Sequence, residues 1–180
     1  MATTIENFAD LPLPEQMRMG LRRLGKAVAV ITAWHGEKRW AMTATAVSEL
    51  SMDPPSLLVC VNRNASLYEP LSLRSNFCVN ILHSDQANIS QACFGDNKGE
   101  ARFRLGHWDS AACGTPLLRE GQANFVCEYQ DILEYGTHAI IIGRVDEVRI
   151  CGDVDPLIYL DGCYTRACPL APEGTAAQGE

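Results

Sequence analysis

Residues 40–51 carry a run of short side chains that suits the close approach of a flat ligand. The segment begins as a strand pattern and then becomes small and hydroxylated, with Thr43, Ala44, Thr45, Ala46 and Ser48 in near succession. Short side chains bring a planar ligand close to backbone N–H groups and to hydroxyls that can hydrogen-bond to it. Asp53-Pro54-Pro55 follows, and because proline donates no ladder hydrogen bond, we expect the strand to stop there. An ordinary edge strand with a polar face fits the same residues.

Four further side chains have types that suit the recognition of a charged ligand. Arg63, Arg102 and Arg104 stand where loops are expected and could converge on an anion, and the planar guanidinium suits phosphate. His138 opens an apolar strand directly after a glycine turn. For each arginine the alternative is a solvated surface charge, and for His138 it is a structural role at the mouth of a strand.

Other catalytic classes find little support in the motifs. Residues 20–26 match the start of a phosphate-binding P-loop, but a helix is expected before them, a strand after them, and position 27 is alanine instead of Ser or Thr. Neither the Gly-x-Gly spacing of a Rossmann fingerprint nor a Gly-x-Ser-x-Gly hydrolase elbow occurs in the sequence. Cys-x-x-Cys pairs and histidines at ligand spacing are also missing, so we expect no metal site.

Length and composition are typical of one soluble globular domain. The 180 residues are 47% hydrophobic and 21% charged, and we expect a domain over residues 1–168 and a disordered tail over 169–180. The net charge of −7 argues against non-specific nucleic-acid binding. Eight scattered cysteines, no visible secretory signal and no apolar run long enough for a membrane span lead us to expect reduced thiols and a cytoplasmic location.

The order of the expected elements favours an antiparallel barrel. A helix pattern covers residues 15–24, and further helices are expected at 67–74, through a capping-box spacing of Ser66 and Glu69, and at 85–94. Strands are expected at 27–33, 40–51, 57–61, 77–82, 123–132, 137–150 and 157–160, with 95–121 mostly loop. Few helices lie between neighbouring strands, whereas parallel sheets need long crossovers, so a doubly wound α/β fold fits less well.

Together, the order and spacing of these segments resemble the short flavin reductase family, the reductase partners of two-component flavin-dependent monooxygenases such as phenol and chlorophenol hydroxylases. The resemblance covers residues 17–164. It depends on residues 25–33, 42–48, 50–55, 60–66, 77–82, 102–103, 138–145 and 156–159. This chain departs from the family at Leu24, where Pro-Thr or Val-Thr often precedes the glycine, and at Lys26, where valine is common.

The resemblance implies a fold and a set of site residues. The implied fold is mainly β, a six-stranded antiparallel split barrel of the FMN-binding type with a few appended helices, usually a homodimer with flavin near the subunit interface. The flavin ring is expected against Met42, Thr43, Ala44, Thr45, Ala46, Ser48, Val59, Cys60, Val61 and Asn62, with its phosphate near Arg63 and Ser66. Asn80, Ile81, Arg102 and Phe103 are further expected cofactor-binding residues. His138, Tyr159, Asp161, Gly162 and Tyr164 match the region where relatives meet the nicotinamide nucleotide.

The implied activity is hydride transfer from NADH to a diffusible flavin, with FAD preferred and FMN possible. Reduced flavin would then leave for a separate monooxygenase acting on an aromatic compound. His138, as the candidate catalytic residue, would act by positioning the nicotinamide. NADH is favoured over NADPH because no arginine cluster beyond Arg63, Arg102 and Arg104 is apparent. One alternative is the same barrel as a tight FMN-binding electron-transfer module without free NADH turnover. The other is a pyridoxamine-phosphate-oxidase-like enzyme, which would need a denser basic pocket for phosphate than this acidic chain offers.

Overall fold

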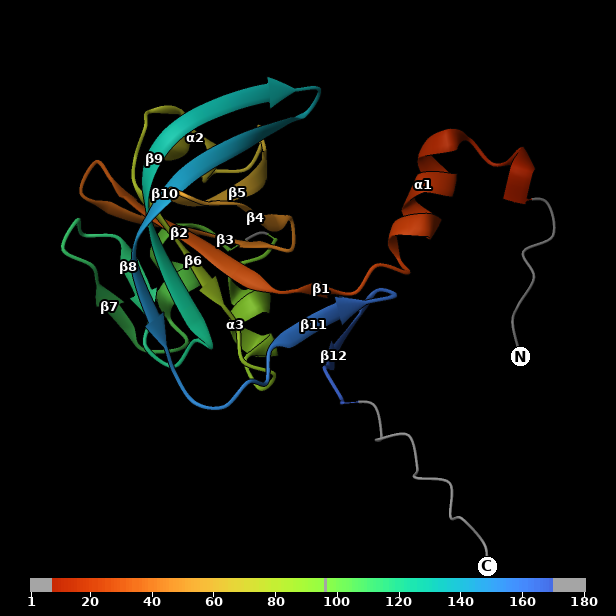
Figure 1. Ribbon diagram of the computed structural model, residues 1–180. Helices are drawn as coiled ribbons and strands as arrows, with labels where there is room; N and C mark the ends of the chain where they lie inside the picture. Colours follow the sequence, from red (N-terminus) through yellow and green to blue (C-terminus); the bar gives the residue numbers. More distant parts are fainter. Residues whose placement is uncertain (1–7, 96, 170–180) are drawn as a thin grey trace, which may run out of the picture.

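A seven-stranded antiparallel sheet forms the body of the protein, for which a computed structural model describes residues 8–95 and 97–169 (Figure 1). In spatial order, its strands are β3 (Lys38–Ala44), β2 (Ala29–His35), β6 (Phe77–Ile81), β9 (Ala123–Tyr135), β10 (His138–Ile150), β5 (Pro55–Asn62) and β4 (Val47–Met52). Every neighbouring pair is antiparallel. The mainly β, antiparallel fold expected from the sequence is therefore confirmed.

The two outer strands of this sheet, β3 and β4, are consecutive in the chain. Only Thr45 and Ala46 separate them, so the sheet curls until its first and last strands meet end to end. One shared core contains Ile31, Val59 and Ile141 from three of the strands, which makes the sheet a barrel around a common interior. The barrel is split at residues 45–46. Counting β3 and β4 as one interrupted strand gives the expected six, but the number of separate strands in the sheet is seven.

Alternation of side chains along the strands fills this interior. Val59, Phe77 and Val79 are completely buried in the core, each on an inward position of its strand. At Gly143 the packing leaves no room for a side chain, because a Cβ there would lie 2.5 Å from Phe77 Cζ and 2.7 Å from Cys127 Cβ. Helix α2 (Tyr68–Ser72) adds the buried Leu71 to the same core.

A second layer covers the outside of the barrel. It consists of α3 (Ala87–Ala92), the 3₁₀-helix η2 (Gly99–Phe103) and the hairpin of β7 (Trp108–Ser110) with β8 (Pro116–Leu118). These elements form a second core around Val28, Leu82, Ile89 and Leu118. The segment 95–121, expected mostly as loop, therefore contains three short ordered elements.

A smaller three-stranded sheet and the N-terminal helix lie beside the barrel (Figure 1). The sheet has the order β1 (Lys26–Ala27), β11 (Leu157–Leu160) and β12 (Cys163–Arg166), and β12 is a strand that the sequence reasoning missed. A 3₁₀-helix, η1 (Phe8–Asp10), precedes α1 (Leu13–Leu21). Helix α1 buries none of its residues, and its apolar side chains Leu13 and Met17 are exposed.

The boundaries of the expected elements were only partly right. The helix over 15–24 is confirmed but ends at Leu21, and strand 27–33 is interrupted at Val28. Helix α1 ends at Leu21, near the start of the P-loop-like motif of residues 20–26, and β1 begins at Lys26, the last residue of that motif. The order of helix, motif and strand is therefore the expected one. The capping box at Ser66 and Glu69 is wrong, because Leu67 is the N-cap of α2 and no side chain caps it. Residues 170–180 of the expected tail lie outside the described part of the chain.

Two further properties of the described residues bear on function. Within residues 8–95 and 97–169, no helix has the length and apolar character that a membrane span requires. All eight cysteines are free thiols. Burial raises the pKa of Cys93 and of Cys127 to about 12, so these two thiols stay protonated and unreactive near neutral pH.

Asp155 fastens the β11–β12 hairpin to the barrel and gives a prediction for acid stability. Its carboxylate accepts hydrogen bonds from Ser84 Oγ at 2.7 Å and from Arg166, and these two contacts hold its pKa below the ordinary value. A lowered pKa stabilises the fold above the unfolded value of about 4, and that stability is lost as the pH falls through the lowered pKa. We expect Asp155→Asn to weaken this dependence, measured as urea midpoints between about pH 6 and pH 3.

The control for this measurement is Asp146→Asn, on an exposed carboxylate of β10. It should leave the pH profile of the midpoint unchanged. An Asp155→Asn profile parallel to that of the native protein would show that the anchor does not contribute to acid sensitivity.

Candidate functional site

The split in the barrel leaves hydrogen-bond donors free. Thr45 and Ala46 belong to neither strand, and among the described residues their N–H groups donate no hydrogen bond. Both residues are half-buried, while the Ala46 carbonyl accepts the Cys60 N–H at 2.9 Å. Backbone donors in such a place are ordinarily satisfied by a partner. The break therefore offers two adjacent N–H groups to a ligand, next to the unbonded hydroxyl of Thr45.

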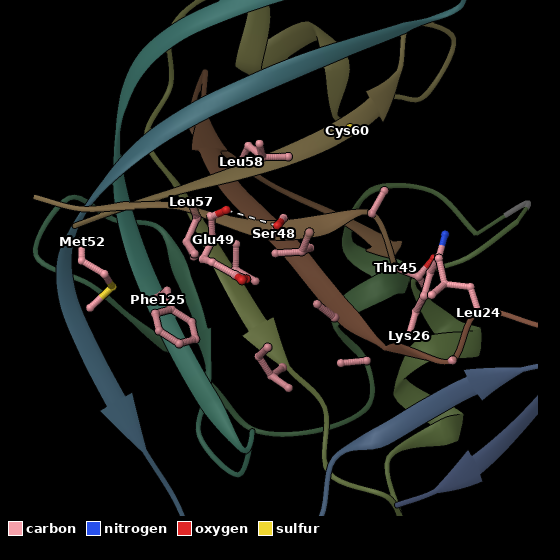
Figure 2. A pocket seen from close by; sticks show the side chains of 17 residues that line it. Leu24, Lys26, Thr45, Ser48, Glu49, Met52, Leu57, Leu58, Cys60 and Phe125 are labelled. Carbon is pink, nitrogen blue, oxygen red and sulfur yellow. Dashed lines mark hydrogen bonds between the residues drawn. The ribbon is translucent and has the colours of Figure 1, made fainter. Parts of the chain in front are cut away.

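A groove of about 690 Å³ opens beside this break, a volume within the range of small-molecule sites. Figure 2 shows Thr45 and Lys26 near one end and Met52 and Phe125 near the other. Its floor near the break is made of short residues, with longer apolar side chains along the rest. The complete lining is Leu24, Gly25, Lys26, Ala27, Ala29, Thr45, Ala46, Val47, Ser48, Glu49, Met52, Leu57, Leu58, Cys60, Val79, Ile81 and Phe125.

A smaller recess of about 220 Å³ meets the groove at Thr45, which lines both. Its other lining residues are Val28, Thr43, Ala44, Ser90, Phe94, Tyr159 and Tyr164. The two tyrosine rings pack edge to face with centroids 5.6 Å apart, and the hydroxyls of Tyr164 and Ser90 lie 2.9 Å apart. The recess therefore has an aromatic wall that is held to α3.

Thr43 belongs to this recess but has little bonding capacity left. Its N–H donates to the Cys93 carbonyl at 3.2 Å and its hydroxyl to the Ser90 carbonyl at 2.6 Å. Both groups therefore hold β3 against the end of α3. Of the short residues expected to donate to a flavin ring, Thr45, Ala46 and Ser48 remain at the groove.

His138, Asn62 and Arg63 come together at the mouth of the barrel, where β10 begins and β5 ends. His138 lies opposite Asn62 in the strand register, and the Arg63 N–H donates to the Thr137 carbonyl at 3.0 Å. The three side chains are exposed. Asn62 is two residues along β5 from Cys60 of the groove, about 7 Å in an extended strand. The Arg63 guanidinium lies 3.5 Å from the Glu134 carboxylate, which offsets part of its charge.

Several expected ring contacts instead face the barrel interior. Val59 and Val61 are fully buried core residues, and Met42 packs against the same core. The side chains of Val59 and Val61 therefore pack in the core and do not line the groove, whereas Cys60 between them does.

Asn80 is also a core residue, whereas its neighbour Ile81 lines the groove. Asn80 Oδ1 accepts hydrogen bonds from the Leu118 N–H and from Asn124 Nδ2, both at 2.8 Å, and its Nδ2 donates to the Val30 carbonyl at 2.9 Å. The side chain is completely buried and its amide is engaged on both ends. The expectation that Asn80 binds the cofactor is therefore corrected to a structural role.

The pair Arg102 and Phe103 needs the same correction. Arg102 is 9% exposed, and its guanidinium donates to the carbonyls of Ala41 and Asn97 and, at 3.3 Å, to the hydroxyl of Ser66. The Phe103 ring is covered by the Arg39 guanidinium, 4.3 Å from its centroid, and by Trp108. Arg102 thus holds Ser66 in place, and Phe103 is packed in the outer core, so neither offers a surface for a cofactor.

Asp161 and Gly162 form the turn between β11 and β12 and line a third recess next to α1. Asp161 accepts a hydrogen bond from Arg22 Nε at 2.8 Å. Tyr159 lines both this recess and the aromatic one. The four expected nucleotide contacts of the hairpin therefore divide between two neighbouring recesses.

Sequence reasoning missed much of the groove wall. Leu57, Val79 and Phe125 come from three different strands and meet only when the barrel closes. Ser90 and Phe94 of the aromatic recess come from α3 and the segment after it. Alternation within each strand indicates which residues share a face, but it does not show which strands become neighbours.

Comparisons with known proteins agree on one family. A family model described as the flavin reductase like domain matches residues 21–167. Over 175 residues the chain is 37% identical to the reductase component of the FADH(2)-dependent resorcinol hydroxylase of Rhizobium sp. (strain MTP-10005), covering 96% of each chain. It is 33% identical over 151 residues to the FMN reductase (NADH) RutF of Bradyrhizobium diazoefficiens, covering 84% of each.

A solved structure supports the same fold assignment. BorF, the flavin reductase component of a bacterial two-component tryptophan halogenase, superposes with a TM-score of 0.77 at 27% sequence identity. The match covers 85% of this chain and 97% of BorF.

Proposed function

The chain belongs to the family of flavin reductase like domains and is a flavin reductase, and from this premise we propose the reaction and partners that its site supports best. The proposed reaction is hydride transfer from NADH to a diffusible flavin, with FAD first and FMN as the alternative. The reduced flavin then supplies a separate monooxygenase that acts on an aromatic compound. A relative's name as the reductase component of a resorcinol hydroxylase supports this partnership.

The observation that carries the proposal is the pair of N–H donors at Thr45 and Ala46, placed on the groove. The pyrimidine side of a flavin presents carbonyl and ring-nitrogen acceptors, and the short side chains at the break leave room for a flat ring. When bound, the flavin accepts the hydride directly from the nicotinamide, so the reaction requires no acid–base side chain. Because reduction places negative charge on the pyrimidine side, donors fixed at the break stabilise the product more than the substrate.

The remaining residues of the site would bind and position. Ser48 and Cys60 border the proposed ring position. We place the nicotinamide between His138 and the aromatic recess of Tyr159 and Tyr164, whose rings would exclude water from the transferred hydride. Ser66, whose hydroxyl Arg102 holds, and Arg63 are the proposed contacts of the flavin phosphate.

The character of the groove favours a flavin that leaves. The wall is largely apolar, and its charged side chains are Lys26 and Glu49, one of each sign. A shallow and nearly neutral bed suits release of a reduced product. A barrel that kept FMN as a fixed group would remain yellow after purification, whereas we expect a colourless protein that bleaches added flavin in the presence of NADH.

We also propose that the protein works as a homodimer with the groove near the subunit interface. Leu57 and Phe125 of the groove wall are only partly buried, and Met52 at its end is 83% exposed. A second copy would cover this apolar surface. Sedimentation or light scattering at several protein concentrations tests this assembly.

Replacing Ala46 with phenylalanine tests the ring site. The added ring would fill the groove at the break, and we expect kcat/KM for the flavin to fall by about tenfold or more. The assay is anaerobic flavin bleaching by NADH, run also with NADPH and with FAD, FMN and riboflavin as acceptors. Ala112→Phe, on the exposed turn between β7 and β8, is the matched control. Normal flavin kinetics in a folded Ala46→Phe variant would remove the groove from the proposal.

A further inference from the structure

Helix α1 carries an apolar stripe that stays uncovered among the residues that the structure describes. Leu13, Met17 and Leu21 follow one another at four-residue spacing, so they lie on one face of the helix, and Leu24 follows in the turn after it. These four side chains are between 44% and 75% exposed. The helix has only nine residues, and so short a helix is marginal in water without packing contacts. A surface outside this helix is therefore needed to cover the stripe.

The connection between α1 and the barrel holds the helix away from its own sheet. Arg22 Nε donates to Asp161 Oδ1 at 2.8 Å, and the Arg22 carbonyl accepts the Asp161 N–H at 2.9 Å, so the end of α1 is fastened to the β11–β12 turn. Figure 1 shows α1 standing clear of the barrel, on the side toward which the tip of the β9–β10 hairpin also projects. The stripe is therefore open to a second molecule and not to the barrel of its own chain.

The outer face of strands β5, β10 and β9 is a second apolar surface. Val59 and Ile141 lie opposite each other in the register and point into the core, so the residues on either side of them point outward. Five apolar side chains make up this outer face, and none of them belongs to a core of the described residues: Leu58, Cys60, Leu133, Ile140 and Ile142. Leu133, near the hairpin tip, is 61% exposed. Apolar patches of this kind mark sites of association.

The charges beside the two surfaces are opposite. Residues 13–24 contain Arg18, Arg22 and Arg23 against the single carboxylate of Glu15, whereas the whole chain has a net charge of −7. The rest of the chain is therefore more acidic still. On the outer face, Asp131 lies opposite Ile142 and is exposed. In the described part of the chain, neither Arg23 nor Asp131 takes part in an ion pair. A basic helix and an acidic sheet face attract each other.

We propose that α1 of one copy packs across the outer face of β5, β10 and β9 of a second copy, which returns its own α1 in the same way. A two-fold axis makes the two contacts identical, so each chain covers both of its apolar surfaces. Leu58 and Cys60 belong to the outer face and also line the groove, so the helix of the second copy forms a wall of the proposed flavin site. This assignment rests on the proposed homodimer and names the helix and the sheet face that join its subunits.

Sedimentation equilibrium of full-length variants tests the helix contact. Leu13→Glu and Met17→Glu are each expected to raise the dimer dissociation constant by about 100-fold or more, because a charge replaces an apolar side chain in both symmetric contacts. Both residues are exposed in the single chain, so their replacement leaves the barrel folded. Val154→Glu is the control, since Val154 is 94% exposed in the loop between β10 and β11. A native dissociation constant in both helix variants overturns the proposal.

Photo-crosslinking tests where the helix docks. The photoreactive residue p-benzoylphenylalanine replaces Met17, and the variant is mixed with isotopically labelled chains, so that mass spectrometry identifies links between copies. We expect links to β5, β10 or β9 of the other copy, and none from the same residue at Lys38 on the exposed β2–β3 hairpin.

The possible failures are distinguishable, because neither measurement needs a flavin. A dimer whose links from position 17 fall on other elements overturns this proposal and leaves the homodimer in place. A monomeric native protein overturns both the homodimer and this proposal, while bleaching of flavin by NADH would still support the reductase function. The expected links in a protein that reduces no flavin count against the proposed reaction alone.

Discussion

Replacing His138 with alanine is expected to lower kcat/KM for NADH by about 100-fold, because loss of a positioning contact at a reacting centre has effects of that size. His138 is exposed at the start of β10, opposite Asn62 and beside Arg63. We propose that a nicotinamide bound next to the flavin contacts it there. The hydroxyl of Thr137 lies 2.9 Å from its Nδ1, which fixes the orientation of the imidazole. Hydride transfer needs no proton from this ring, so flavin Kd should change by less than about threefold.

Steady-state kinetics measure kcat and KM for NADH separately in the variant and in the native protein. Fluorescence quenching measures the Kd of the flavin in both. His107→Ala is the matched control, because His107 is also an exposed histidine, and it pairs with Glu120 near the β7–β8 hairpin. His138→Phe separates two possible roles: a ring that only shields the flavin should rescue the rate, whereas one that orients the nicotinamide through a hydrogen bond should not. Unchanged NADH kinetics in His138→Ala would remove His138 from the site.

Replacing Asn80 with alanine is expected to destabilise the fold by roughly 3–5 kcal/mol. The substitution deletes the acceptor of two buried donors, the Leu118 N–H and Asn124 Nδ2, and each orphaned donor costs about 1–3 kcal/mol. The Val30 carbonyl and the Thr32 hydroxyl lose a donor as well. For a chain of this size, such a loss lowers the unfolding temperature by roughly 10 °C.

Denaturant unfolding tests this prediction as a fall in the midpoint at constant slope. Asn88→Ala is the control, because Asn88 is exposed on α3 and its Oδ1 bonds to the adjacent Ile89 N–H. Kinetics well below the unfolding temperature provide a second readout. A core role predicts nearly normal flavin KM in the folded fraction, whereas a stable Asn80→Ala variant with weakened flavin binding would support the original assignment of Asn80 to the cofactor.

Local patterns were sufficient to predict the longer strands and the fold class, but not β7, β8 or β12. The apolar runs at 57–61 and 77–82 became β5 and β6, and the glycine turn before His138 joined two long strands. Short polar strands escaped detection, as β12 shows, because Cys163–Arg166 has neither an apolar run nor an alternating pattern. The capping-box spacing at Ser66 misled, because the N-cap of α2 is Leu67. The Ser66 hydroxyl instead accepts a hydrogen bond from Arg102, 36 residues away in sequence.

The site was harder to predict than the fold. The strip at Thr45 and Ala46 was identified because its side chains are short, but the reason for its free donors is the split between β3 and β4, a property of barrel closure. Arginine, the residue that sequence reasoning trusted for anion binding, serves at position 102 as a buried clamp on backbone carbonyls. Burial and long-range partners decide such roles, and both depend on the assembled tertiary structure.

Because of the two-residue gap between β3 and β4, substitutions that raise the thermal stability of this protein are expected to lower its turnover. Any substitution that lets residues 45 and 46 join the hydrogen-bonded ring would add ladder bonds, remove an irregularity and raise thermal tolerance. The same change would engage the amides that we propose as the hydrogen-bond donors to the flavin. Libraries of this protein selected by heat challenge alone should therefore accumulate variants that survive well and catalyse poorly, with their mutations concentrated around this gap.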